Sequence, residues 1–214
     1  HRWSERWRST VRLNANRVHL DNQGGGLTGG VRFASAASTE QRDGVHAALQ
    51  NTYVGDKLVY ESNVQYSWFH WVAGNPANPN SPRVNVQGPD GTLRAVLGHP
   101  GFAFDSVENT FQLQQKVSYA LGDHNLKAGA DVLLSDHGLT GGGNPNGTYT
   151  VQLTQSQFNR FRAAPIDPSL GPAGLPGALG TDAQNIDVTN YRVELRPSSF
   201  GVRQDLIGLY VEDE

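Results

Sequence analysis

The sequence predicts an all-β fold of long antiparallel strands, and three observations support this class. Period-two alternation of apolar and polar residues recurs in long segments, whereas the helical period is almost absent. Short glycine-containing turns, at Gly55-Asp56 and at 122–124, join neighbouring alternating segments as hairpins. The alternating segment at 57–71 is also much longer than the usual ~5–6 residues of a globular-protein strand.

The composition of the chain excludes some kinds of protein and is compatible with others. The chain has 214 residues, of which 37% are hydrophobic, with a mean hydropathy of -0.49. No run approaches the ~18 apolar residues that a spanning helix needs, so a helical membrane protein is excluded. A membrane β-barrel is compatible with this composition, because only alternate residues of its ~9–11-residue spanning strands face lipid. The chain has no cysteine, which excludes disulfides and thiolate metal sites. Its net charge of -3 gives no sign of the basic surface that binds nucleic acid.

The first half of the chain should contain four strands. The segment 7–20 alternates Trp7, Val11 and Leu13 with Arg8 and Arg12. The glycine-rich QGGGLTGG leads into a weaker strand of small residues at 27–37, and 38–44 is expected to be a loop. The segments 45–54 and 57–71 then form a tight hairpin around Gly55-Asp56. After this hairpin, the density of proline, glycine and asparagine predicts a long loop at about 72–109.

The second half repeats the pattern of a short turn followed by a long loop. Strands are expected at 110–121 and 125–136, and Gln115 interrupts the apolar row of the first. A second long loop is expected at about 136–200. This loop should contain a short helix near 155–162 and a hairpin between 148–151 and 188–195. The last strand is 201–213, which makes seven in all. Alternating short turns and long loops are typical of outer-membrane barrels.

The aromatic residues favour lipid as the environment of the apolar rows. Tyr53, Tyr60 and Tyr119 lie near the short turns, and Tyr66, Trp68 and Phe111 lie at the opposite, long-loop ends of their strands. Two such lines are what the boundaries of a bilayer require, because amphipathic rings prefer the head-group level. No charged residue lies in the middle of an apolar row. We therefore predict an antiparallel transmembrane β-barrel segment with two long external loops.

Three segments of the chain resemble the TonB-dependent outer-membrane receptors, in particular the Oar-like group that has a carboxypeptidase-regulatory-like domain. They are FQLQQKVSYALGDHNLKAGADVLLSDH at 111–137, GTYTVQLTQSQFNRF at 147–161 and DLIGLYVEDE at 205–214. Two residues depart from the pattern: Glu212 stands where glutamine is common, and Ala128 where an aromatic often precedes the glycine. The resemblance implies that residues 1–214 are part of a 22-stranded barrel. As a fragment, this part should form an open curved sheet, and the plug, energy-coupling box and N-terminal domain would lie upstream.

The sequence offers only weak candidates for a metal site, a phosphate-binding loop or a catalytic site. The candidate metal ligands are His70, His99, His124 and the pair Asp136-His137, but no two histidines share a ligand spacing such as HxxxH. QGGGLTGG lacks the context of a phosphate loop, and Asp90-Gly91 and 144–147 are expected to be turns rather than calcium contacts. There is no catalytic signature, so we expect no enzyme activity, no metal site and no cofactor.

The functional hypothesis is a piece of a receptor in the outer membrane of a Gram-negative cell. The resemblance implies energy-coupled uptake of an unidentified nutrient, such as a glycan fragment, a peptide or a metal chelate. Its expected partners are membrane lipid, that nutrient and an inner-membrane energy-coupling complex, with no nucleic acid. Any ligand-binding surface should lie in the loops 72–109 and 136–200 and on the polar rows. A passive porin or adhesion barrel, and a soluble carbohydrate-binding β-sandwich, remain as alternatives.

Overall fold

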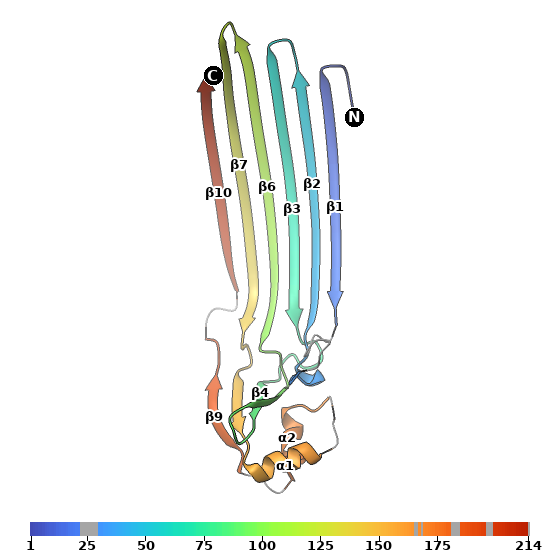
Figure 1. The fold of residues 1–214 in the computed structure, drawn as a ribbon, viewed down its shortest axis with the longest axis vertical. Coiled ribbons are helices and arrows are strands. Elements are labelled where there is room, and N and C mark those ends of the chain that lie inside the picture. The colour runs from blue at the N-terminus through green and yellow to red at the C-terminus, as the bar shows by residue number, and fades with distance from the viewer. Residues whose placement is uncertain (22–29, 165–166, 168, 181–184, 196–198, 214) are drawn as a thin grey trace.

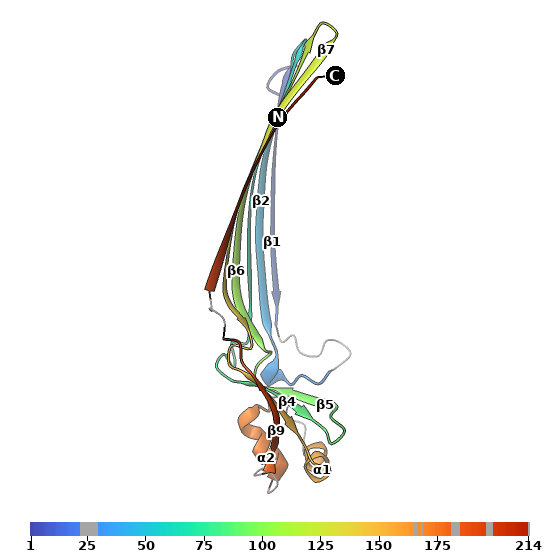
Figure 2. The ribbon, with the colours of Figure 1, turned by 90° about the vertical axis from the view of Figure 1, so that its left-hand side faces the viewer.

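Six long antiparallel strands form one large sheet in the computed structural model of the chain, which describes residues 1–21, 30–164, 167, 169–180, 185–195 and 199–213. The sheet is a single curved layer, and its short turns lie at the end opposite a small folded cap (Figures 1 and 2). Its strands follow the order β1-β2-β3-β6-β7-β10. Their bounds are β1 Trp7–Leu20, β2 Thr39–Val54, β3 Leu58–Gly74, β6 Phe102–Leu121, β7 His124–Gly143 and β10 Ser199–Asp213.

The register of the large sheet places the predicted apolar rows side by side. Val64 of β3 pairs with Leu49 of β2 and with Leu113 of β6, and Leu113 pairs with Val132 of β7. Val132 pairs in turn with Ile207 of β10. Because directly paired residues point to the same face, the sheet has one continuous apolar face and one continuous polar face.

The tight turns are the features that fix this register. The Gly55 N–H donates to the Leu58 carbonyl over 2.7 Å, which closes the β2–β3 hairpin. At the β6–β7 turn, Gly122 takes a φ of 61°, a left-handed conformation that favours glycine. Both hairpins are confirmed, and a one-residue slip in either would move a whole row to the other face.

The predicted strand count was wrong by one. Residues 27–29 of the expected strand 27–37 lie outside the described residues, and Ala34–Ala36 form the 3₁₀ turn η1 instead. The small side chains there provide little surface to pack, and Ser35 and Ala36 are buried under the cap rather than exposed on a sheet. The expected loop 38–44 was also wrong, because β2 already begins at Thr39.

The connections between the long strands fold into a cap with its own sheet, ordered β5-β4-β8-β9. Its core contains Val86, Leu97, Leu153 and Leu179, each almost completely buried. Among the described residues no helix has the length and apolar character needed to span a membrane. The cap elements are β4 Arg83–Gln87, β5 Leu93–Leu97, β8 Thr148–Gln152, α1 Gln155–Ala163, η2 Pro172–Gly174, α2 Leu175–Leu179 and β9 Asp187–Arg192.

Both connections are therefore shorter than the expected loops, and their described residues include strands and helices. Instead of ending at 71 and 136, β3 continues to Gly74 and β7 to Gly143, and instead of beginning at 110, β6 begins at Phe102. The expected helix near 155–162 is confirmed as α1, and the expected hairpin is confirmed by the pair Val151 and Val188. The parallel pairing of β4 with β8, which joins the two loops, was not expected.

Candidate ligand-binding surfaces

The polar face of the large sheet carries hydrogen-bonding side chains along its whole length. His46 of β2 contacts the Gln65 side-chain oxygen across the strands over 3.1 Å, and Glu61 of β3 is the register partner of Lys116 of β6. Two polar hollows lie on this face, of about 100 Å³ and 270 Å³, and both include Gln50. This face can hold water or a polar ligand.

The apolar face has no cover from the rest of the described chain. Leu209 and Val211 of β10 are 79% and 84% exposed, and Leu13 of β1 is 71% exposed. The sheet is one layer thick here (Figure 2). The soluble β-sandwich is thereby contradicted, because a sandwich would bury this face against a second sheet.

The polar residues within the apolar face bind one another. Gln115 donates from Nε2 to Ser62 Oγ over 2.8 Å and accepts a hydrogen bond from the Tyr60 hydroxyl. On the neighbouring strands, the Ser9 hydroxyl donates to Asn51 Oδ1 over 2.6 Å. The break that Gln115 makes in the apolar row is therefore compensated, because a polar group away from water is costly only when it lacks a partner.

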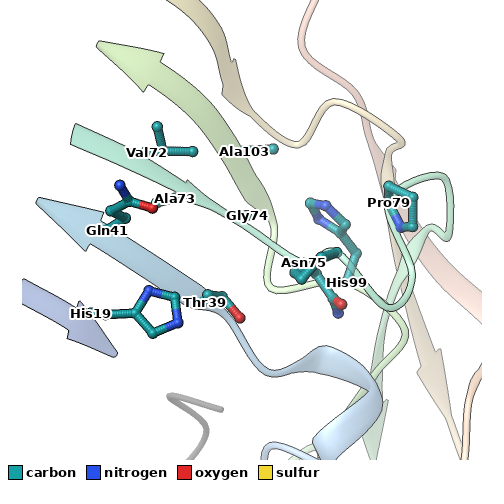
Figure 3. A pocket seen from close by; sticks show the side chains of 11 residues that line it. His19, Thr39, Gln41, Val72, Ala73, Gly74, Asn75, Pro79, His99 and Ala103 are labelled. Carbon is teal, nitrogen blue, oxygen red and sulfur yellow. The ribbon is translucent and has the colours of Figure 1, made fainter. Parts of the chain in front are cut away.

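A pocket of about 350 Å³ lies where the large sheet meets the cap (Figure 3). From the sheet, Gln41 and Thr39 of β2 and Val72 of β3 reach it. From the cap side, Asn75 and His99 close it. The whole lining is His19, Thr39, Gln41, Val72, Ala73, Gly74, Asn75, Pro76, Pro79, His99 and Ala103.

Two histidines, His19 and His99, are among the described residues that line this pocket, and His99 is only 1% exposed. Its Nδ1 accepts a hydrogen bond from the Gly101 N–H over 3.1 Å, so the neutral ring carries its proton on Nε2. Nε2 has no hydrogen-bond partner in the part of the chain that the structure describes. Burial, and secondarily the positive charge of Arg83, lower the pKa of His99, so its ring is neutral near pH 7.

The histidines weighed as metal ligands are not brought together. Each of the other three contacts a different partner: His70 contacts Asp105 over 2.8 Å, His124 contacts Asp213 over 2.9 Å, and His137 contacts Ser106 over 2.9 Å. Within the described ranges, no three His, Cys, Asp or Glu side chains group closely enough to hold a metal ion.

The expected turns at 90–91 and 144–147 are present. Asp90 accepts a hydrogen bond from the Thr92 N–H over 3.1 Å, and Gly91 takes a φ of 74°. Asn144 takes a φ of 48° and its carbonyl accepts from the Gly147 N–H over 3.1 Å. The Asp90 carboxylate and the Asn144 carbonyl therefore form hydrogen bonds that stabilise these turns. Most of QGGGLTGG, expected to be a flexible turn, lies outside the described residues.

A family model described as "Outer membrane beta barrel domain" matches residues 1–214. The chain belongs to this outer membrane β-barrel family. The predicted fold class and the location in the outer membrane are thereby confirmed. The apolar face is then the lipid-facing surface of the barrel wall, and the polar face lines its lumen.

One similar solved structure is the outer membrane transporter YddB from Escherichia coli. The match has a TM-score of 0.54 at 12% identity, so it concerns the fold alone. It covers 99% of this chain and 23% of YddB, so the chain spans about a quarter of the length of that protein. No curated protein sequence matches this barrel chain significantly.

Proposed function

We propose that this chain is part of the barrel wall of a TonB-dependent receptor that takes up a nutrient across the outer membrane. The observation that carries the proposal is the combination of a two-faced wall with a folded cap on its long-loop end (Figure 1). A wall that is polar on its lumen side leaves room for an aqueous path. A cap with a core of its own, built from connections that meet across the sheet, presents a rigid surface to a ligand outside the cell.

The energy-coupled mechanism is proposed from the family resemblance of 111–137, 147–161 and 205–214. On this proposal the nutrient meets the cap first and then the lumen residues of the wall, among them His46, Gln65, Glu61 and Lys116. An inner-membrane energy-coupling complex would act through a part of the protein upstream of this chain. The role requires no catalysis and no nucleic acid, and neither a catalytic signature nor a basic patch stands out in the sequence.

The test is an uptake assay in cells that produce the full-length protein. Labelled oligosaccharides, peptides and metal chelates are supplied separately, and accumulation is compared among wild-type cells, cells lacking this protein and cells lacking the inner-membrane coupling protein. We expect one class of compound to accumulate only when both proteins are present, and a protonophore to abolish its accumulation.

Uptake that depends on this protein but survives both the protonophore and the loss of the coupling protein would show a passive porin instead. Adhesion to surfaces without uptake of any supplied class would favour an adhesion barrel. Either result contradicts the proposed receptor.

A further inference from the structure

Another pocket, of about 280 Å³, lies within the cap between α1, α2 and β5. Figure 1 shows α1 and α2 at the end of the cap that is farthest from the short turns of the large sheet. In an outer-membrane barrel the short turns face the periplasm and the long connections lie outside the cell. A nutrient that arrives from outside therefore meets this pocket before it meets the lumen. The lining is Phe33, Arg94, Phe161, Arg162, Ala164, Asp167, Leu170 and Ala178.

The floor of this pocket is apolar and is anchored in the core of the cap. Phe33 and Phe161 lie with their ring centres 6.4 Å apart, and Leu170 packs with them against the buried core. All three side chains are only half-buried, so they leave apolar surface open to a ligand. The volume is near the lower end of the ~300–1,000 Å³ range of small-ligand sites. It suits one apolar side chain better than a sugar chain or a metal chelate.

Two arginine side chains lie at the rim of this floor. The guanidinium carbons of Arg94 and Arg162 lie 5.1 Å and 5.7 Å from the centre of the same Phe158 ring. Phe158 and Arg162 share one face of α1, because they are four residues apart. A cation is expected at the C-terminal end of a helix, but that does not account for a second one from β5. Guanidinium groups bind carboxylates through paired N–H donors, so the rim favours a ligand with a carboxylate.

Both guanidinium groups can be reached from solvent. The side chain of Arg94 is 37% exposed, and Arg162 is also exposed. Arg94 donates from one nitrogen to Asp90 Oδ2 over 2.7 Å, which leaves further N–H donors on the same fork. Arg162 forms no ion pair with an acidic side chain of the described residues. Its charge is therefore available to a bound anion.

The rim also carries an acceptor for an N–H group. Asp167 Oδ1 accepts from the Ser169 hydroxyl over 2.6 Å and from the Ser169 N–H over 2.9 Å. These hydrogen bonds lower the pKa of the Asp167 carboxyl, so it is charged near pH 7. Asp167 is exposed, and its Oδ2 accepts no hydrogen bond within the described part of the chain. The pocket thus places a donor pair and an acceptor above an apolar floor.

We propose that this pocket binds the C-terminal residue of a peptide. The apolar side chain of that residue fills the floor, its carboxylate accepts hydrogen bonds from Arg162 and Arg94, and its N–H donates to Asp167 Oδ2. A neutral oligosaccharide lacks the carboxylate, and a simple fatty or aromatic acid lacks the N–H. The inference rests on the proposed function and deepens it, because it selects peptides among the classes of nutrient.

The test measures binding of fluorescently labelled pentapeptides to the purified full-length protein in detergent by fluorescence anisotropy. One peptide ends in phenylalanine with a free carboxylate, the second ends in the amide of phenylalanine, and the third ends in serine with a free carboxylate. We expect the first to bind about tenfold more tightly than either of the others. The second lacks the charge that Arg162 binds, and the third lacks the apolar side chain.

Unlabelled competitors distinguish a peptide from smaller ligands with related groups. Phenylacetate has the ring and the carboxylate but no N–H, and should compete about tenfold less well than the unlabelled peptide. Free phenylalanine should also compete less well than the peptide, because its charged ammonium must be desolvated at the rim. Phenylalanine that competes as well as the peptide would overturn the peptide as the ligand and assign the site to free amino acids.

Two variants remove the site in different ways. Arg162→Gln removes the charge and should weaken binding of the first peptide by about tenfold, with no effect on the amide peptide. Ala178→Leu fills the pocket from α2 and should weaken binding by a similar factor. The matched control is Arg192→Gln, which removes the same charge from an exposed residue of β9 outside the pocket. Its binding should equal that of wild type. Hydrogen exchange of β4 reports whether each variant keeps a folded cap, and Arg162→Gln decides the question if Ala178→Leu does not.

Equal binding of the acid and amide peptides, unchanged binding in a folded Arg162→Gln variant, or an equal loss in Arg192→Gln would each overturn the proposal. Binding to the purified protein needs no energy coupling, so its failure can be separated from failure of the proposed receptor. Peptide binding that depends on Arg162, in a protein whose uptake survives the protonophore, would contradict the receptor but support this site. Energy-coupled uptake of a sugar or a chelate by a protein that binds none of the peptides would support the receptor but contradict this site.

Discussion

Gly141 of β7 lies directly against the Ala103 carbonyl of the neighbouring strand β6. A carbon at the Cβ position of Gly141 would come within 2.1 Å of that oxygen, and the φ of Gly141 is 94°. Only glycine fits this position, because the contact is with backbone and the conformation is rare for residues with side chains. The contact lies where the barrel strands pass into the cap, so it fixes how the two parts join.

Replacing this glycine should loosen that junction. Gly141→Ala is expected to lower the free energy of unfolding by about 1–3 kcal/mol, since the new methyl must displace backbone or strain φ. Gly138→Ala, three residues earlier on β7, should change it by less than about 0.5 kcal/mol, because nothing lies within 4 Å of its Cβ position. Urea unfolding of the full-length protein in lipid vesicles measures both. Equal effects would show that the Ala103 contact is not tight.

The assignment of faces predicts opposite outcomes for two adjacent residues of β6. Leu113→Lys places a charge on the lipid-facing row, one position inward from Phe111, and should destabilise the barrel by about 1–2 kcal/mol, between the costs at the interface and at the midplane. Gln114→Lys places the same charge on the lumen face, where water solvates it, and should have little effect. The measurement is unfolding in vesicles, with the heat-dependent shift in gel mobility as a check of folding. A larger cost for Gln114→Lys than for Leu113→Lys would reverse the assignment.

The barrel wall could be predicted from the sequence because its signals are local. The hairpin turns at 55–56 and 122–124 join strands that alternate, so the turns alone set which residues face one another. Gln115 looked like a defect in sequence, since its partners Tyr60 and Ser62 lie more than fifty positions away and only the fold brings them together.

The cap could not be predicted in the same way. Its strands β4 and β8 have five residues each, come from two different connections and pair in parallel. No turn joins them and neither is long enough to show a clear alternation, so the sequence does not indicate that they pair. In the sequence, no motif or spacing distinguishes His99 from the other histidines. Its burial and its hydrogen bond with the Gly101 N–H arise from the fold of the cap, and no pattern in the surrounding sequence indicates them.

The cap helix α1 has an N-terminus that can be tested separately. The Thr154 hydroxyl accepts from the Gln157 N–H over 3.3 Å, and the Gln157 side chain accepts from the Thr154 N–H over 2.8 Å. Thr154→Ala removes half of this capping box and should destabilise α1 by about 1 kcal/mol. Thr154→Ser keeps the oxygen and should be close to wild type. Hydrogen exchange of the amides of α1 distinguishes the two variants. Equal exchange in both would show that the Thr154 hydroxyl does not stabilise the N-terminus of α1.

The buried His99 should make the cap less stable in acid. Its folded-state pKa is lowered by burial and by Arg83, whereas in the unfolded chain it returns to about 6.5. The unfolded state therefore binds more protons as the pH falls below about 6.5, and the stability contributed by neutral His99 declines from there toward the lowered pKa. His19, with Asp21 over 3.2 Å, is the other histidine at this pocket, and it is exposed to solvent.

The measurement is hydrogen exchange of β4 and β5 between pH 7.5 and pH 5, corrected for the intrinsic exchange rate. We expect protection in wild type to fall over this range. In His99→Gln, which has no titrating group at this position, protection should fall less. His19→Gln is the control for the other histidine of the pocket and should retain the wild-type decline, because this side chain is exposed to solvent. An identical pH dependence in wild type and His99→Gln would show that protonation of His99 does not limit the stability of the cap.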